Sequence, residues 1–326
     1  MKILVYGAGV IGSVYAAYLH HGGHDVTVLA RGRRLAELRD HGILLEAAST
    51  GERIEARLPV VDQLEPDDAY ELVLVAMQKV HLASVLPILA ANRGTPSVAF
   101  LGNNAAGPDA LIEALGAERV LMGFPGFGGY FEGPRVHFAS QSGDTSRLDM
   151  TLGELDGSTT PRMRAIVRAM AAGRVKVAVE PHIDAWLKGH AALVTPILFA
   201  LNRHALDNEA LARDRATLGL TVQAVREGLC ALRELGHPIT PFKLRSISWM
   251  PLFAATALFA RILGSDFARV AYAGHAANAA AEFELLHREL RDLTGRSGLP
   301  TPALDALAHD ASASSARCAG SKTKPS

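Results

Sequence analysis

The sequence is poor in cysteine. Its 326 residues include only Cys230 and Cys318, which lie far apart and form neither a CxxC pair nor a disulfide framework. This usage is typical of a reducing compartment, and we predict a cytoplasmic location. The first residues, Met1 and Lys2, are followed directly by an apolar run and lack the three-part pattern of a secretory signal peptide.

Net charge and long apolar runs are also missing. The 33 basic residues balance the 33 acidic residues, and no basic stripe is present. This excludes the global field that attracts nucleic acid or an anionic membrane. No uninterrupted apolar run is long enough to span a bilayer, because Arg261, Asp266 and Arg269 interrupt the stretch that begins near Leu252. We therefore expect a small-molecule partner, with no nucleic acid and no membrane.

Several motifs of metal and hydrolytic chemistry are absent. The thirteen histidines form no H-E-x-x-H pattern, and there is no G-x-S-x-G sequence. The Gly-Ser-Lys-Thr sequence at 320–323 lacks the upstream glycine of a P-loop. We predict no metal site. His190 is two positions from Lys188, faces largely away from it on a helix, and is interpreted as structural.

What the sequence does contain is a regular alternation of strands and helices up to about residue 180. Strands are predicted over 3–6, 26–30, 72–77, 97–101 and 175–179, and helices over 13–21, 33–41, 80–91 and 110–115. The glycine-rich and aromatic stretch 123–133 is predicted to be a loop with a sheet edge. After Pro181 almost everything reads as helix. This pattern predicts an α/β fold: a Rossmann-type domain over 1–180, an all-helical domain over 181–310 and a disordered tail over 311–326.

A glycine motif follows the first predicted strand. Gly7, Gly9 and Gly12 give G-x-G-x-x-G between a strand and a helix. The first glycine permits a tight turn, the second lets a pyrophosphate approach the backbone, and the third lets the helix pack on the strand. The helix N-terminus, with Val10 and Ile11, offers N–H groups to the phosphates. We predict a dinucleotide site; the alternative is a glycine turn that serves packing alone.

The residue after the second strand distinguishes between cofactors. NAD sites usually have Asp or Glu there, to bind the ribose hydroxyls. This chain has Arg31, followed by Arg33 and Arg34. A guanidinium suits a 2′-phosphate, so we predict NADP(H) rather than NAD(H) or FAD. The alternative is that the three arginines only solvate a loop.

The helical part begins with a lysine in an informative place. Lys188, one turn into the predicted helix, could reach a bound nicotinamide and act as a proton donor; otherwise it is a solvated lysine at a helix start. Farther on, the apolar run 249–262 suits either a core or the interface of a homodimer.

The order of these segments resembles the ketopantoate reductase (2-dehydropantoate 2-reductase) family over about residues 1–307. The segments that carry the resemblance are KILVYGAGVIGSVYAAYL, VLARG, ELVLVAMQK, FLGNNAAGPDALIEALG, DAWLK and AAAEFELLHRELRDLTGRSGLPTP. The resemblance implies an NADP-binding domain over 1–180 and a helical substrate and dimerisation domain over 181–310. It also implies reduction of a 2-keto acid by NADPH at a cleft between the two.

The resemblance assigns roles to particular residues. Lys188 matches the family's catalytic lysine and Glu282 its glutamate, which is implied to bind a substrate hydroxyl or a cofactor ribose and to orient the lysine. The family's strand-end asparagine matches Asn103, or Asn104 if the register shifts by one. These asparagines are implied to hold the nicotinamide ribose and amide, or the lysine, and Asn103 also to contact substrate.

Some positions depart from the family. Its asparagines one and two turns after the lysine are replaced by Ala192 and by Thr195 next to Pro196, which makes this substrate face less polar. Its serine is missing from 268–272, where Arg269 is either a carboxylate clamp or a surface charge. A gapless match places Gln78 at a cofactor-contacting lysine, with Lys79 next to it.

Three functions are compatible with these residues. The first is reduction of 2-dehydropantoate to pantoate, a step of pantothenate biosynthesis. The second is reduction of a different, less polar 2-keto acid, because a lost hydrogen-bond partner changes the preference for a substrate hydroxyl strongly. The third is a non-catalytic NADP(H)-binding sensor, which the retention of both Lys188 and Glu282 disfavours.

Overall fold

The computed structural model of the chain describes residues 1–273 and 280–309. The packing divides the chain into two compact units. The first comprises Met1–Asn103 and Gly107–Asp184, and the second comprises Asn104–Ala106 and the chain from Ala185 onward. The tail predicted over 311–326 lies outside the described residues.

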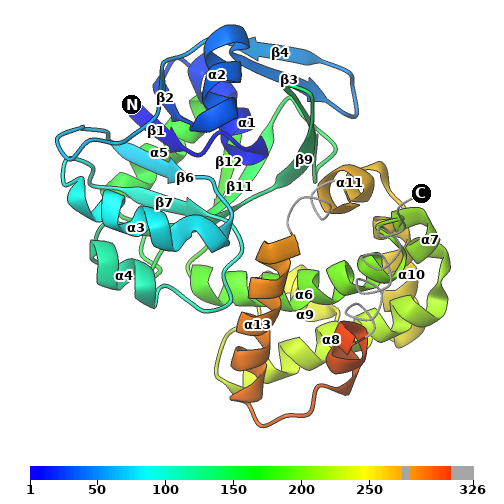
Figure 1. Ribbon diagram of the computed structural model, residues 1–326. Helices are drawn as coiled ribbons and strands as arrows, with labels where there is room; N and C mark the ends of the chain where they lie inside the picture. Colours follow the sequence, from blue (N-terminus) through cyan, green and yellow to red (C-terminus); the bar gives the residue numbers. More distant parts are fainter. Residues whose placement is uncertain (274–279, 310–326) are drawn as a thin grey trace, which may run out of the picture. The chain divides into compact units, whose positions relative to one another are not determined.

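The first unit is built on a large sheet with the strand order β12-β11-β8-β7-β6-β1-β2-β5 (Figure 1). Its strands are β1 (Lys2–Tyr6), β2 (Asp25–Leu29), β5 (Val60–Val61), β6 (Leu72–Val75), β7 (Val98–Leu101), β8 (Val120–Pro125), β11 (Leu148–Glu154) and β12 (Val175–Val179). The strands from β8 to β5 pair in parallel, whereas β11 is antiparallel to β8. The predicted open, mainly parallel sheet is confirmed.

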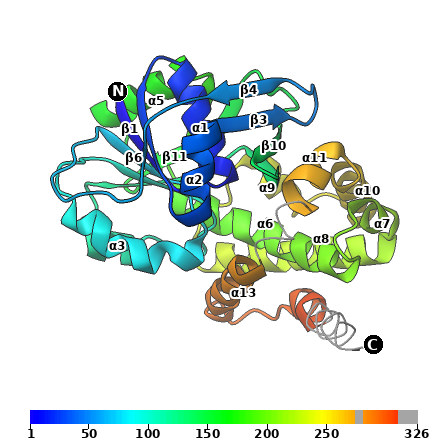
Figure 2. The same cartoon turned by 45° about the horizontal axis from the view of Figure 1, so that its top comes forward.

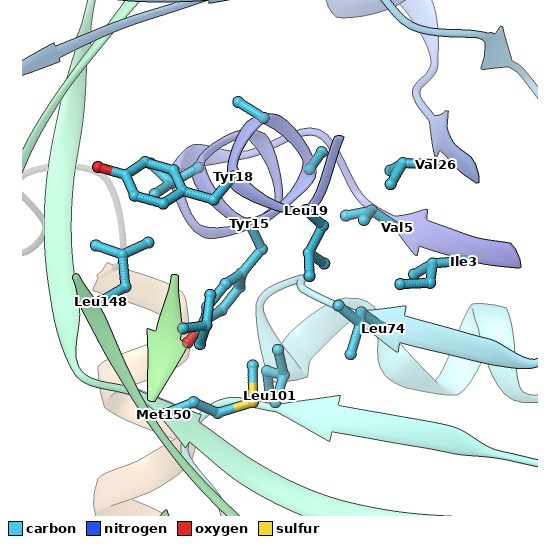
Figure 3. Packing of buried hydrophobic residues seen from close by; sticks show 14 of the residues in the cluster. Ile3, Val5, Tyr15, Tyr18, Leu19, Val26, Leu74, Leu101, Leu148 and Met150 are labelled. Atoms are coloured by element: carbon cyan, nitrogen blue, oxygen red, sulfur yellow. The ribbon is translucent and has the colours of Figure 1, made fainter. Parts of the chain in front are cut away.

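Helices cover this sheet as the alternation predicts. They are α1 (Val10–His21), α2 (Gly32–His41), α3 (Leu82–Ala91) after the short 3-10 helix η1 (Lys79–His81), α4 (Asp109–Leu115) and α5 (Pro161–Ala172). Figure 3 shows how Leu19 of α1 points toward Leu74 of β6, and Tyr15 toward Met150 of β11. All four side chains are fully buried, and this apolar contact fixes the helix that follows the glycine motif.

A second, smaller sheet packs on α1 with the order β4-β3-β10-β9 (Figure 2). Its strands are β3 (Ile43–Ala47), β4 (Arg53–Ala56), β9 (Phe127–Glu132) and β10 (Arg135–Ser140). The rings of Tyr15 and Phe127 meet edge to face at 4.9 Å, which joins the helix to this sheet.

The prediction of a loop with a sheet edge over 123–133 was wrong in part. The structure forms β8 and β9 there, with only Gly126 between them. The glycines hide the strand pattern because they serve close approach: a Cβ on Gly129 would lie 2.2 Å from the carbonyl oxygen of His137. Of the aromatic residues in this stretch, Phe127 belongs to the core.

The second unit is helical, as predicted. Its helices are α6 (Ile183–Arg203), α7 (Asn208–Arg213), α8 (Arg215–Glu234), α9 (Phe242–Ser246), α10 (Leu252–Leu263), α11 (Asp266–Ala268), the π-helical turn Arg269–Ala273, α13 (Ala280–Gly295) and a last helix over 302–309. Among the described helices, none is both long and apolar enough to cross a membrane. The Glu227 carboxylate on α8 accepts hydrogen bonds from the backbone N–H groups of Ala303 and Leu304, each 3.0 Å long, and so caps the last helix.

We predict that His190 makes the stability of the second unit depend on pH. It is partly buried on α6 and stacks on Trp186 with a ring separation of 5.3 Å. Burial lowers the pKa of His190 to about 4, below the value of about 6.5 for an unfolded chain. Between these values the unfolded chain binds a proton that the folded chain does not. We therefore expect the free energy of unfolding to decrease as the pH is lowered through that window, by up to about 1.4 kcal/mol per pH unit.

Urea unfolding at pH 7.5 and pH 5 measures this effect. His190→Phe should lose less stability between the two pH values than the wild type, whereas the exposed control His41→Phe should behave like the wild type. An unchanged pH dependence in His190→Phe would show that other groups cause the acid sensitivity.

Candidate functional site

The glycine turn joins β1 to α1. Gly7 has φ = 108°, and a Cβ there would lie 2.7 Å from the carbonyl oxygen of Ala76. A Cβ on Gly12 would lie 1.9 Å from the carbonyl oxygen of Gly7. The fold itself therefore requires these two glycines.

Gly9 is different. A Cβ added at Gly9 would meet nothing within 4 Å in the described structure, so packing does not explain this glycine. It immediately precedes α1 and has no side chain that could cap the helix. Open space above N–H groups at a helix N-terminus is what a pyrophosphate needs, so this turn fits a dinucleotide.

The other predicted residues of the first unit gather at the same edge of the sheet. Because β2, β1, β6 and β7 are neighbours and parallel, their carboxyl ends meet at one edge. The glycine turn follows β1, Arg31 follows β2, Gln78 and Lys79 follow β6, and Asn103 follows β7. The chain leaves β1 to one side for β2 and returns on the other side as β6, which is where ligands bind in open parallel sheets.

The three arginines of the sequence have separate positions. Arg31 is exposed and donates hydrogen bonds to Tyr6 Oη at 3.1 Å and to the carbonyl oxygen of Asp62 at 3.4 Å. Arg33 is 92% exposed and pairs with Glu37 at 3.3 Å. Of these two, Arg31 lies nearer the strand end, so it is the guanidinium that suits a 2′-phosphate.

Arg34 serves the fold instead. Its Nε donates to the carbonyl oxygen of Ala8, its Nη2 to Ser13 Oγ and its Nη1 to the carbonyl oxygen of Pro134, each at 3.2 Å. Burial lowers the pKa of Arg34. The side chain therefore fastens α2 to the glycine turn and to the smaller sheet, a role that the sequence pattern does not indicate.

In the second unit, Lys188 is buried on α6. Its exposed fraction is 5%, and helical spacing places it on one face with Ala192 and Thr195. Lysine is seldom buried to this extent in proteins.

The predicted substrate face is closed at Ala192. A Cβ on Gly228 of α8 would lie 3.0 Å from Ala192 Cβ, so the two helices meet closely there. An asparagine at 192 would need space that α8 occupies. One turn farther, Thr195 Oγ1 is buried and has no hydrogen-bond partner in the part of the chain that the structure describes.

Glu282 and Arg269 also belong to this unit. Glu282, 4% exposed, lies in the first turn of α13. Arg269 is 58% exposed and pairs with Asp266 at 3.0 Å, which favours the surface-charge interpretation over the clamp. Over 1–273 and 280–309, no group of three or more His, Cys, Asp or Glu side chains is placed to hold a metal ion.

The fold and these residues define a two-unit protein with a Rossmann-type dinucleotide-binding sheet. Residues 3–154 match the model of the family described as Ketopantoate reductase PanE/ApbA. The resemblance predicted from the sequence is thus confirmed over these residues, where the chain matches the model of this family.

Comparison with individual proteins gives the same picture. The chain is 26% identical to the oxidoreductase YkpB of Bacillus subtilis (strain 168) over 195 residues, which cover 58% of this chain and about three fifths (61%) of that protein.

Two solved structures have the same fold. The 2-dehydropantoate 2-reductase from Geobacter metallireducens GS-15 has a TM-score of 0.77 at 17% identity, with 96% of this chain and 99% of that chain covered. D-mandelate dehydrogenase in complex with NADH and anilino(oxo)acetate has a TM-score of 0.78 at 17% identity, with 96% and 98% covered.

Proposed function

We propose that the chain is an NADP(H)-dependent reductase of a 2-keto acid, with 2-dehydropantoate, which gives pantoate, as the first candidate substrate. With this substrate the reaction is a cytoplasmic step of pantothenate biosynthesis. The observation that carries the proposal is the buried Lys188 in a chain whose glycine turn and strand-end residues fit a dinucleotide. Burial of a lysine is unfavourable, which supports a role in chemistry for this one.

The residues have complementary tasks in this reaction. A bound nicotinamide supplies the hydride that the ketone carbon receives. Lys188 stabilises the negative charge that develops on the ketone oxygen and gives its Nζ proton to that oxygen, which completes the hydroxyl group. Glu282 binds a substrate hydroxyl or a cofactor ribose and orients Lys188, and Asn103 or Asn104 holds the nicotinamide ribose and amide. Backbone N–H groups from Gly9 to Gly12 hold the pyrophosphate.

Arg31 is proposed to select NADPH. Replacement by alanine removes a charge-assisted contact to the 2′-phosphate and should raise KM for NADPH about 10- to 100-fold, with little change for NADH. Steady-state kinetics with NADPH and with NADH measure the ratio of the variant's KM to that of the wild type for each cofactor. Arg33→Ala, at the 92% exposed neighbour, is the matched control and should behave like the wild type. Equal losses with both cofactors would contradict the assignment of Arg31 to the 2′-phosphate.

A second candidate substrate is a less polar 2-keto acid. The sequence favours it, because Ala192 and Thr195 replace the asparagines that the family resemblance implies and so remove two amide groups. D-mandelate dehydrogenase, which has this fold, binds anilino(oxo)acetate in its complex with NADH. A 2-oxo compound with an aromatic group can thus be bound by a protein of this fold, which supports the second candidate.

The experiment is an NADPH oxidation assay across a panel of 2-keto acids with ketopantoate and with branched and aromatic side chains. Turnover of ketopantoate supports the first candidate, and preference for apolar side chains supports the second. If no 2-keto acid of the panel is reduced, the reductase proposal is overturned. Retained NADPH binding would then favour the non-catalytic NADP(H)-binding sensor.

Assembly into a homodimer is part of the proposal. Large apolar side chains are exposed on and between α9 and α10, among them Phe242 at 64%, Trp249 at 63% and Phe253 at 79%. Exposed apolar clusters of this kind are typical of interfaces, which supports a homodimer through this surface.

A further inference from the structure

A short segment of the chain departs from the unit around it. Asn104–Ala106 belongs to the second compact unit, although the chain on both sides of it belongs to the first. Ala105 is fully buried in the core of the helical unit, and Asn104 is 7% exposed. The segment directly follows Asn103, the predicted site residue after β7.

One carboxylate holds this segment in place. Glu289 Oε2 accepts hydrogen bonds from the backbone N–H groups of Ala105 at 3.1 Å and of Ala106 at 3.2 Å. Both donors meet the same charged acceptor, and hydrogen bonds to an ionised group are stronger than those between neutral groups. The bonded residues are 184 and 183 positions apart in the sequence, so the contact is a true tertiary anchor.

The anchor lies on the helix that carries Glu282. Glu282 and Glu289 are two turns apart on α13, which places them on the same side of the helix. Orientation of the peptide groups at 105 and 106 fixes the backbone that leads into them from Asn104. The same carboxylate therefore fixes the segment that begins at Asn104 on the helix that carries Glu282.

We propose that Glu289 is a positioning residue: it holds Asn104, and the chain leaving Asn103, on the helix that bears Glu282. The inference rests on the proposed function, in which these asparagines hold the cofactor. In this proposal Glu289 acts through the segment that it binds. Its expected effect is on the affinity for NADPH as well as on turnover, because displaced asparagines no longer meet the nicotinamide ribose.

Three variants test the inference. Glu289→Ala removes the acceptor, Glu289→Gln keeps an oxygen that can accept the same two N–H groups, and Glu284→Ala changes an exposed carboxylate of the same helix. We expect Glu289→Ala to raise Kd for NADPH about tenfold, Glu289→Gln to restore most of that affinity, and Glu284→Ala to match the wild type. Kd is measured by NADPH fluorescence well below each variant's unfolding temperature, and kcat with the best 2-keto acid is measured alongside.

The outcomes separate this inference from the proposed function. A wild type that binds NADPH but reduces no 2-keto acid overturns the reductase proposal. In that case the Kd values of the Glu289 variants for NADPH still test the positioning role. A Glu289→Ala variant with a lower unfolding temperature but a wild-type Kd and kcat overturns the positioning role and makes the anchor merely structural. Equal Kd values for the Ala and Gln variants overturn it too, and a wild type without NADPH binding overturns both proposals.

Discussion

Replacement of Lys188 by alanine is expected to lower kcat for the 2-keto acid about 10²- to 10⁴-fold, with Kd for NADPH close to that of the wild type. The variant loses both the positive charge that stabilises the developing alkoxide and the proton that completes the hydroxyl group. NADPH binding should survive because the glycine turn and Arg31 belong to the other compact unit. Single-turnover oxidation of NADPH, followed by absorbance, measures the chemical step directly.

Two further lysine variants make the result specific. Lys188→Arg keeps the charge but replaces the proton donor by a group that cannot be deprotonated near neutral pH, so it separates charge stabilisation from proton transfer. Lys176→Ala changes an exposed lysine of β12 and should retain full activity. Because Lys188 is 5% exposed, each variant is first checked for an unchanged unfolding temperature. Full activity in a folded Lys188→Ala would remove this residue from the reaction.

The substitution Gly9→Ala is expected to weaken NADPH binding about tenfold or more without changing the stability of the cofactor-free protein. The added methyl group meets nothing within 4 Å, and the backbone at Gly9, with φ = −70°, suits alanine. In the proposed function, however, the methyl group would occupy the space that the pyrophosphate needs. Titration with NADPH gives Kd, and thermal unfolding without cofactor gives the stability.

The other glycines are matched controls for this prediction. Gly12→Ala should destabilise the protein even without cofactor, because its methyl group would meet the Gly7 carbonyl oxygen at 1.9 Å. Gly219→Ala, on α8, adds a methyl group to equally open space in the other unit, so it should leave the affinity for NADPH unchanged and raise the stability slightly, as alanine favours a helix more than glycine does. Wild-type affinity in Gly9→Ala would mean that the turn serves the fold alone.

The parts of the fold that could be predicted are those whose signal is local. β1 and β6 are buried apolar runs, and the helix after the glycine motif follows from its own spacing. The smaller sheet could not be predicted in this way. β10 pairs with β3, which lies about ninety residues earlier, and β3 pairs with a four-residue strand after a turn. Such short strands have little pattern of their own and form because remote partners satisfy their backbone groups.

The residues of the candidate site also differ in whether a local sequence signal predicts them. The glycine turn and Arg31 can be predicted because each is a residue type needed at a fixed distance from a strand. Lys188, Glu282 and Asn103 come from the family resemblance, and their roles stay predictions. The roles of Arg34 and Glu289 could not be found in the sequence because each bonds two backbone groups of other segments, Ala8 and Pro134 for Arg34 and Ala105 and Ala106 for Glu289. Every residue type has a backbone carbonyl group, and nearly every type has a backbone N–H group, so a sequence pattern does not reveal which of these groups a side chain will bind.

The excursion of Asn104–Ala106 into the helical unit has a consequence for how such proteins can be recombined. A chimaera that joined this chain's residues 1–184 to the helical half of a relative would place Ala105 against a foreign helix. Ala105 is fully buried, and its N–H is bonded to Glu289, so the graft would lose both packing and a hydrogen-bond acceptor. The units of exchange are therefore not the two stretches on either side of residue 184. A transplanted helical half must bring its own three-residue segment, spliced into the middle of the other unit.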